Sequence, residues 1–293
     1  MIKENIVSLV DGFTVELNPK VRHKLKSIPL DKKNNVYITY LPDATENDIL
    51  ETVDFVSKQE LTPITHLPAR TMKDLDHVSD FLKELRNRTD SKKILVIGGG
   101  GNQNGSVSSS LEILESGLLK DNEFEEIGIA GHPEGSPDID QNTVNEFLNK
   151  KYELSKDKNL NLELVTQFFF NAEPFIKWCK FLDNSNIKLP VRVGFPGPAS
   201  FKTLLNFGIM SGVGNSLSFL KKNSSKVTDL LTKTSNDEMF IELANFSKEQ
   251  SSFKNFHCFP FGGFEKTCHW LNALQNGDFT MENDKIVLHN KIF

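Results

Sequence analysis

The segment ILVIGGGGNQNGSVSSSLEIL (94–114) contains, in order, an apolar run typical of a buried strand, a glycine-rich loop and the start of a helix. The same succession recurs along the chain, where eight β-rich runs alternate with segments of helical periodicity. The other seven runs are FTVEL (13–17), VYITY (36–40), PITHL (63–67), IGIAG (127–131), LELVT (162–166), VRVGF (191–195) and FHCFPF (256–261).

Three of the intervening segments have clear helical patterns. TENDILETVDFVSKQ (45–59) has Thr45 in position for an N-cap, and MKDLDHVSDFLKELRNR (72–88) and AEPFIKWCKFLDN (172–184) are similar. Because each parallel pair of strands needs a crossover and eight strands can close a sheet, we predict a (β/α)8 TIM barrel. We expect residues 1–293 to form one catalytic domain of this kind. An open doubly wound sheet is the alternative, and in both folds functional groups belong at the carboxyl ends of the strands.

The charge balance limits the classes of partner. The 34 Lys and Arg residues against 39 Asp and Glu give a formal net charge of −5, which argues against a nucleic-acid partner. No run reaches the ~18 apolar residues of a membrane span, and the first residues lack the pattern of a signal peptide. We therefore expect a cytoplasmic protein, alone or as a homo-oligomer, with no membrane partner.

The cysteines indicate neither disulfides nor a metal site. Cys179, Cys258 and Cys268 form no CxxC pair, which fits a reducing compartment. The pairs His257–Cys258 and Cys268–His269 would be poor chelates, because adjacent residues of a strand point to opposite faces. We expect no metal.

Polar residues recur at the predicted strand ends. Taken singly, each is more often a packing, capping or solvent-facing residue than a functional one. Together they indicate a site, because a barrel gathers the carboxyl ends of its strands in one layer. They are Glu16, Thr39, His66, the glycines that follow residue 97, His132 with Glu134, and Thr166 with Gln167.

The glycine run fits no standard phosphate motif. G-x-G-x-x-G fails in every register, and Gly100 to Gly105 has the P-loop spacing but Ser106 where Lys is required. Glycines still permit close approach of a ligand to the backbone, and Ser108 to Ser110 can cap the next helix and leave amide groups facing an anion. An ordinary flexible loop is the alternative.

Five segments, in order and with similar spacing, resemble the methylenetetrahydrofolate reductase family. TVELNPK (14–20) is similar to the family's Ser-Phe-Glu-Phe-Phe-Pro-Pro segment, ITY (38–40) to its Val-Thr-Tyr and THLPAR (65–70) to its His-Leu-Thr-Cys segment. AGHPEGSP (130–137) and TQFFFNAEPFIKWC (166–179) are the most specific. The resemblance implies an FAD-dependent barrel of one-carbon metabolism and methionine biosynthesis. Such an enzyme exchanges hydride between a tetrahydrofolate derivative, methylenetetrahydrofolate, and NAD(P)H as co-substrate.

The resemblance also implies roles for single residues. Glu16 would be the general acid that protonates the folate nitrogen, which requires surroundings that favour a protonated carboxyl. Gln167 would hydrogen-bond the folate, and Phe207 would stack on the folate or nicotinamide ring; otherwise Phe207 is one of many core phenylalanines. The residues that fall where the family contacts FAD are Thr39, His66, His132 and Lys156.

The chain departs from the family after the fourth strand. Gly98, Gly99 and Gly100 stand where the family usually has Arg-Gly-Asp, with the Asp beside the flavin ring, and an expected Arg-Lys pair is Ser155–Lys156. Without that carboxylate we expect a flavin of raised potential and a bias toward oxidation of methyltetrahydrofolate. A flavin-free folate oxidoreductase and a non-redox folate-binding protein are the alternatives. The retained Glu16 argues against a non-redox folate-binding protein, because such a protein has little need of an acid there.

Overall fold

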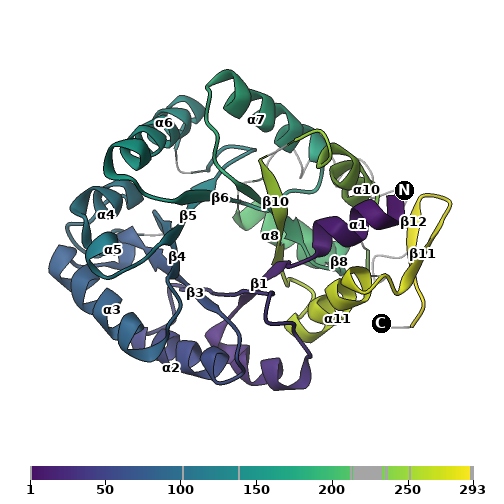
Figure 1. Cartoon of the computed structure of the whole chain (residues 1–293), viewed down its shortest axis with the longest axis horizontal. Helices are drawn as coiled ribbons and strands as arrows, with labels where there is room; N and C mark the ends of the chain where they lie inside the picture. Colours follow the sequence, from purple (N-terminus) through teal and green to yellow (C-terminus); the bar gives the residue numbers. More distant parts are fainter. Residues whose placement is uncertain are drawn as a thin grey trace.

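Eight parallel strands close into a barrel in the order β1-β10-β7-β6-β5-β4-β3-β2, which confirms the predicted (β/α)8 TIM-barrel fold (Figure 1). The computed structural model describes residues 2–100, 102–137, 139–211, 213, 233–234, 237–250 and 252–290. Each barrel strand overlaps one predicted run. They are β1 (Thr14–Leu17), β2 (Val36–Ile38), β3 (Pro63–Pro68), β4 (Lys93–Ile97), β5 (Glu126–Gly131), β6 (Leu162–Thr166), β7 (Val191–Pro196) and β10 (Phe253–Phe259).

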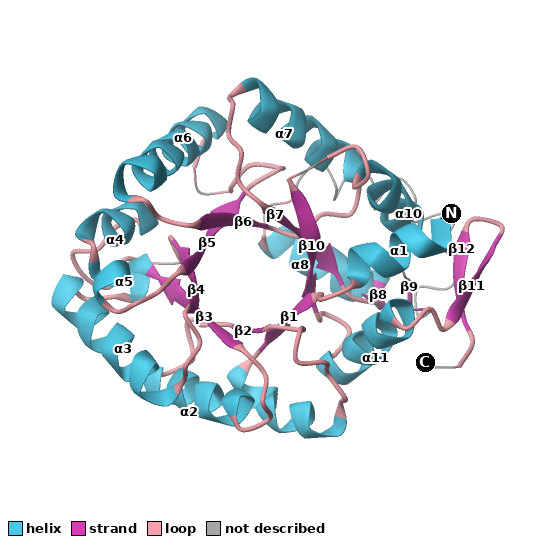
Figure 2. Ribbon diagram, viewed as in Figure 1, coloured by secondary structure: helices cyan, strands magenta, loops and turns pink. Residues whose placement is uncertain are grey.

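Helices surround the barrel on its outer side (Figure 2). The helix α2 begins after Thr45, which is the predicted N-cap and also forms a capping box with Asp48. The helix predicted from residue 72 starts at Leu75 instead, because Asp74 accepts the N–H of His77 and is the N-cap. The described α-helices that follow strands are α2 (Glu46–Ser57), α3 (Leu75–Arg88), α4 (Ser110–Ser116), α5 (Leu118–Asp121), α6 (Gln141–Lys158), α7 (Ala172–Asn184), α8 (Phe201–Met210), α10 (Asp237–Phe246) and α11 (Phe264–Gln275).

Several short elements are additions to the barrel. The helix α1 (Ile2–Val10) packs on α10 and α11, and the 3-10 helices η1 (Pro19–Ser27) and η2 (Ala69–Thr71) follow β1 and β3. An antiparallel hairpin, β11 (Phe279–Glu282) with β12 (Lys285–Leu288), lies at the rim near both termini (Figure 1). A second antiparallel pair joins β8 (Ala199–Ser200) to β9 (Lys233–Thr234). No helix in the described part of the chain is long and apolar enough to cross a membrane.

Below its carboxyl end, the barrel is filled by side chains. Glu163 accepts from Arg192 Nε at 2.7 Å, from Lys254 Nζ at 2.8 Å and from the Tyr37 hydroxyl at 3.2 Å. Burial raises the pKa of the Glu163 carboxyl, but Arg192 and Lys254 outweigh burial and the net shift is downward. Above this ionic layer, Tyr37 packs in one cluster with three apolar side chains, from Ile64, Leu95 and Val165. A ligand therefore has room at the mouth of the barrel and not along its axis.

Candidate functional site

Two imidazoles converge on one carboxyl oxygen at the barrel mouth. Oε1 of Glu16, on β1, lies 3.5 Å from Nε2 of His257 and 3.7 Å from Nε2 of His66. The side chains of Glu16, His66 and His257 are 17%, 9% and 1% exposed, so only the carboxyl retains appreciable access to the mouth. Three strands, β1, β3 and β10, thus build the centre of the candidate site.

The two histidines differ in their surroundings. Burial, with a smaller effect of His257, lowers the pKa of His66 to about 4 against the opposing influence of Glu16, so His66 is neutral at neutral pH. The ring of His257 packs edge-on against Tyr37, and its Nδ1 lies 2.9 Å from the Thr14 hydroxyl. Nε2 of each histidine is buried and has no hydrogen-bond partner among the described residues.

His257 is a site residue that the sequence analysis missed. From the sequence, His257 was interpreted only as one member of the His257–Cys258 pair, which would chelate a metal poorly. Its inward orientation follows from the two-residue alternation of β10, but its proximity to Glu16 depends on the pairing of β10 with β1. That pairing joins residues more than 240 positions apart, and no local pattern encodes it.

A cavity of about 660 Å³ opens at the carboxyl ends of β4 and β5. It brings together four residues that the sequence predicts for a cofactor, Gly98, Gly99, Gly100 and His132. A Cβ added at Gly98 or Gly100 would have no described neighbour within 4 Å, so the backbone there borders open space. Gly99 differs, because its φ is +84° and an added Cβ would lie 2.9 Å from Pro68 Cβ.

Lys151 contributes an unpredicted cation to this cavity. It projects from α6, and burial lowers the pKa of its ammonium group to about 8. Burial also lowers the pKa of His132 to about 4, with a further contribution from Lys151. Among the described residues no carboxylate forms an ion pair with Lys151. A desolvated cation of this kind favours an anionic ligand group.

Lys156, by contrast, is not brought into the site. It lies in the last turn of α6, about half exposed, with its ammonium group 2.7 Å from Glu153 Oε1. A barrel helix runs back from the carboxyl ends of the strands, so each residue along α6 lies about 1.5 Å farther from the mouth. Lys151, five residues earlier, lines the cavity, whereas Lys156 does not.

The serines before α4 form a cap that uses part of the expected anion site. Ser109 accepts the N–H of Glu112 at 3.4 Å and is the predicted N-cap. The Glu112 carboxylate, however, accepts the N–H of Ser108 at 3.2 Å and also both serine hydroxyls. The amide groups expected to face a ligand are therefore partly occupied by the protein's own carboxylate.

The remaining predicted residues lie around the mouth. Thr39 is buried after β2, and its hydroxyl donates to the Leu17 carbonyl at 3.4 Å. Gln167 follows β6, and its Nε2 is buried with no partner in the described structure. Phe207, on α8, stacks on Phe261 with ring centroids 4.0 Å apart. Phe259 lies 5.0 Å from the ring of His257, so an aromatic cluster continues from α8 to His257.

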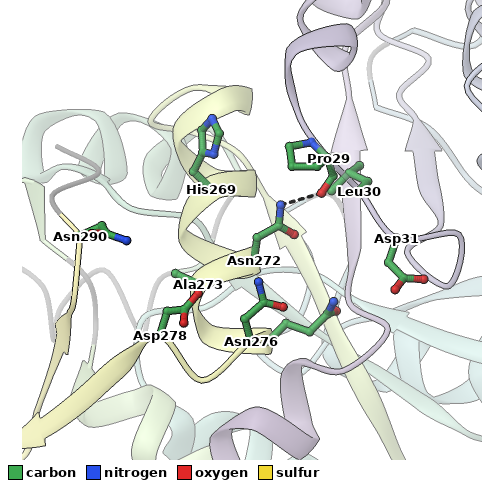
Figure 3. A pocket seen from close by; sticks show the side chains of 10 residues that line it. Pro29, Leu30, Asp31, His269, Asn272, Ala273, Asn276, Asp278 and Asn290 are labelled. Atoms are coloured by element: carbon green, nitrogen blue, oxygen red, sulfur yellow. Dashed lines mark hydrogen bonds between the residues drawn. The ribbon is translucent and has the colours of Figure 1, made fainter.

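A second cavity, of about 510 Å³, lies beside the end of α11 (Figure 3). Asn272 lines this cavity, and its side-chain amide donates to the Pro29 carbonyl at 2.9 Å. The ionisable side chains that line it, Asp31, His269 and Asp278, are exposed. None of its lining residues is among the site residues predicted from the sequence. It is also near the amino end of β2, on the face of a barrel that usually serves stability.

The comparisons with known proteins show the fold. No family model matches the chain. An uncharacterized protein from Clostridium thermocellum that binds two copies of 5-methyl-5,6,7,8-tetrahydrofolic acid is similar over 90% of this chain and 93% of its own, with 14% identity and a TM-score of 0.57. The 7,8-dihydropteroate synthase of Vibrio fischeri ES114 aligns over 90% and 92% of the two chains, with 11% identity and a TM-score of 0.45.

We predict that Lys151→Met stabilises the free protein at neutral pH. The folded-state pKa of about 8 lies below the ordinary value of 10.5, so between these pH values the unfolded chain binds more protons and stability rises with pH. The gain from Lys151→Met should be at most about 3 kcal/mol below pH 8 and should vanish near pH 10.5. Urea unfolding at pH 7 and pH 10 measures it.

The neighbouring variant Lys150→Met is the control for that experiment. Lys150 is half exposed and pairs with Glu146 on the surface of α6, so its removal should change the unfolding free energy by less than about 1 kcal/mol. A loss of stability in Lys151→Met at pH 7 would contradict the interpretation of Lys151 as a desolvated cation.

Proposed function

We propose that the protein binds a reduced folate at the barrel mouth and exchanges hydride with it, with Glu16 as the group that exchanges a proton with the ligand. The observation that carries the proposal is the Glu16 carboxyl, which faces the mouth between two buried imidazoles. A neutral His66 adds no positive charge beside the carboxyl. Proton exchange with a ligand at the mouth is the role that we propose for this carboxyl.

The choice of a folate has three supports. The first is the family resemblance of the segments around Glu16 and Gln167. The second is the folate ligand of the Clostridium thermocellum protein, whose likeness to this chain is one of fold. The third is the mouth itself, where the unpartnered amide of Gln167 and the aromatic cluster with Phe207 can hydrogen-bond and stack a pterin ring.

In the reducing direction, protonated Glu16 gives its proton to the bridging nitrogen of methylenetetrahydrofolate. The carbon–nitrogen bond of the methylene bridge then opens, and the resulting iminium carbon accepts a hydride. In the oxidising direction the carboxylate takes the proton back. A positioned acid of this kind typically accelerates a reaction by about 10²–10⁴-fold.

The cavity at β4 and β5 has features that suit a flavin nucleotide. Gly98 and Gly100 leave open space beside the backbone, and Trp178 supplies an aromatic wall. Lys151 and Arg70 line the same cavity and can offset the charge of phosphate groups. A bound flavin would supply two-electron hydride transfer. Gly98 and Gly100 stand where the family has Arg and Asp. Because these two charged residues are missing, a flavin-free folate oxidoreductase is the second candidate.

We predict that Glu16→Gln separates binding from turnover. The amide keeps the size of the side chain but cannot give or accept the proton, so the Kd for 5-methyltetrahydrofolate should change only a few-fold while turnover falls about 10²–10⁴-fold. Isothermal titration and single-turnover kinetics measure the two effects. The exposed Glu115→Gln, on α4, is the matched control.

The spectrum of the purified protein decides between the candidates. A flavin absorbance band supports the flavin-dependent oxidoreductase. A colourless protein that still oxidises NADH with methylenetetrahydrofolate supports the flavin-free oxidoreductase. Folate binding that Glu16→Gln leaves unchanged, with no turnover in either direction, would instead indicate a folate-binding protein. Failure to bind the folate at all would refute the proposal.

We further predict that Gly100→Asp lowers the midpoint potential of the bound flavin. A carboxylate there would repel the anionic reduced ring, at about 30 mV for each ~1.4 kcal/mol of repulsion. The site tolerates a side chain, since an added Cβ meets nothing within 4 Å. Gly100→Asn has the same shape without the charge, and equal potentials for the Asp and Asn variants would contradict the prediction.

A further inference from the structure

Gln167 faces the barrel mouth because the alternation of β6 continues one step beyond the end of the strand. Val165 and Glu163, two and four residues earlier, both contact the barrel interior, Glu163 in the ionic layer and Val165 in the apolar cluster above it. Since alternate residues of a strand face the same side, Gln167 is the next inward residue. Its N–H still donates to the Gly131 carbonyl of β5 at 3.0 Å. Its side-chain Nε2 is buried without a partner among the described residues.

The hydroxyl of Thr166 holds the other side of the Gln167 backbone. It donates to the Gln167 carbonyl at 2.9 Å and accepts the N–H of Gly194, on β7, at 2.7 Å. A hydroxyl has one proton to donate, and a backbone N–H can only donate, so the direction of both hydrogen bonds is determined. Thr166 is 1% exposed, which shields the two bonds from water.

Gly194 makes this arrangement possible. A Cβ at residue 194 would overlap the carbonyl oxygens of Thr166 and Gln167, so only glycine permits this close approach of β7 to the end of β6. The two peptide groups that flank the Gln167 Cα are thus both held, the first by Gly131 and the second by the Thr166 hydroxyl. Because these planar groups set φ and ψ of Gln167, they also set the direction of its side chain.

We propose that Thr166 and Gly194 are positioning residues that aim the Gln167 amide at the ring of the ligand. A side-chain amide offers one donor end and one acceptor end. The ring that matches it is a planar heterocycle with a hydrogen-bond acceptor beside a donor, which is the pattern of a ring lactam. This inference rests on the proposed function, in which that ring is the pterin of a reduced folate.

The residue after Gln167 places an aromatic wall beside this amide. Phe168 packs edge-on against Phe261 with ring centroids 4.6 Å apart, and Phe261 stacks on Phe207. The backbone that fixes Gln167 therefore also fixes one member of the aromatic cluster. A buried amide atom without a partner costs free energy, and a ring that supplies the partner removes this cost. A ring of the same size without the matching group does not, so the site selects between the two.

A double-mutant cycle on the Kd of 5-methyltetrahydrofolate, measured by isothermal titration, tests the proposal. Thr166→Val keeps the shape of the side chain but removes the hydroxyl, and it should raise the Kd about tenfold. Thr166→Ser keeps the hydroxyl and should restore most of the affinity. In a Gln167→Ala background, Thr166→Val should change the Kd by less than about twofold, because the amide that Thr166 positions is gone.

Thr52→Val is the matched control for this cycle. Thr52 is a buried threonine of α2 whose hydroxyl donates to the Asp48 carbonyl at 2.6 Å, so its replacement removes a similar hydrogen bond and should leave the Kd unchanged. An equal loss of affinity from Thr166→Val with and without the Gln167 amide would overturn the proposal, because Thr166 would then act on the fold and not through Gln167. An unchanged Kd in Thr166→Val would overturn it as well.

NMR of the wild-type protein tests the proposal even if Thr166→Val does not fold. Hydrogen exchange of the Gly194 N–H should be slow in the ligand-free protein, and the side-chain amide resonances of Gln167 should shift when 5-methyltetrahydrofolate binds. Fast exchange at Gly194, or a bound folate that leaves these resonances unchanged, would overturn the proposal. Absence of folate binding in the wild type would refute the proposed function, whereas the exchange at Gly194 measures its bond to Thr166 separately.

Discussion

The pairing of β1 with β10 closes the barrel, and the candidate site depends on it. The register sets Thr14 opposite His257 and Val15 opposite Cys258. Since alternate residues of a strand face the barrel interior, this register points Thr14 and His257 inward together and places Glu16 directly above them. Glu16, the imidazole beside it and the hydroxyl in contact with that imidazole thus come from strands that are far apart in the sequence.

Most of the fold could be predicted because its signals are local. Each barrel strand is a short apolar run, and caps such as Thr45 mark helix starts. The antiparallel pair β11–β12 was missed because Lys285–Leu288 alternates weakly and its turn, Asn283 and Asp284, resembles any polar loop. The closed barrel was inferred from the rules for parallel sheets, whereas the ionic layer around Glu163 follows from no local pattern.

The site was predictable where it consists of strand ends and less so elsewhere. Glu16, His66, His132 and the glycines after β4 follow directly from strand position. On α6 the sequence pointed to Lys156, because a sequence match cannot tell which turn of a helix reaches a cavity; the lysine of α6 that lines the cavity is Lys151. The mouth therefore has a cationic cavity on the β4–β5 side and an aromatic cluster on the α8 side, with Glu16 at the closing strands.

A crystal structure of the protein with 5-methyltetrahydrofolate tests the central claim most directly. The account predicts that the pterin ring lies in the barrel mouth, within hydrogen-bond distance of Gln167, and that a folate nitrogen faces the Glu16 carboxyl. A folate bound outside the mouth, or one that leaves Glu16 without contact to the ligand, would contradict the account.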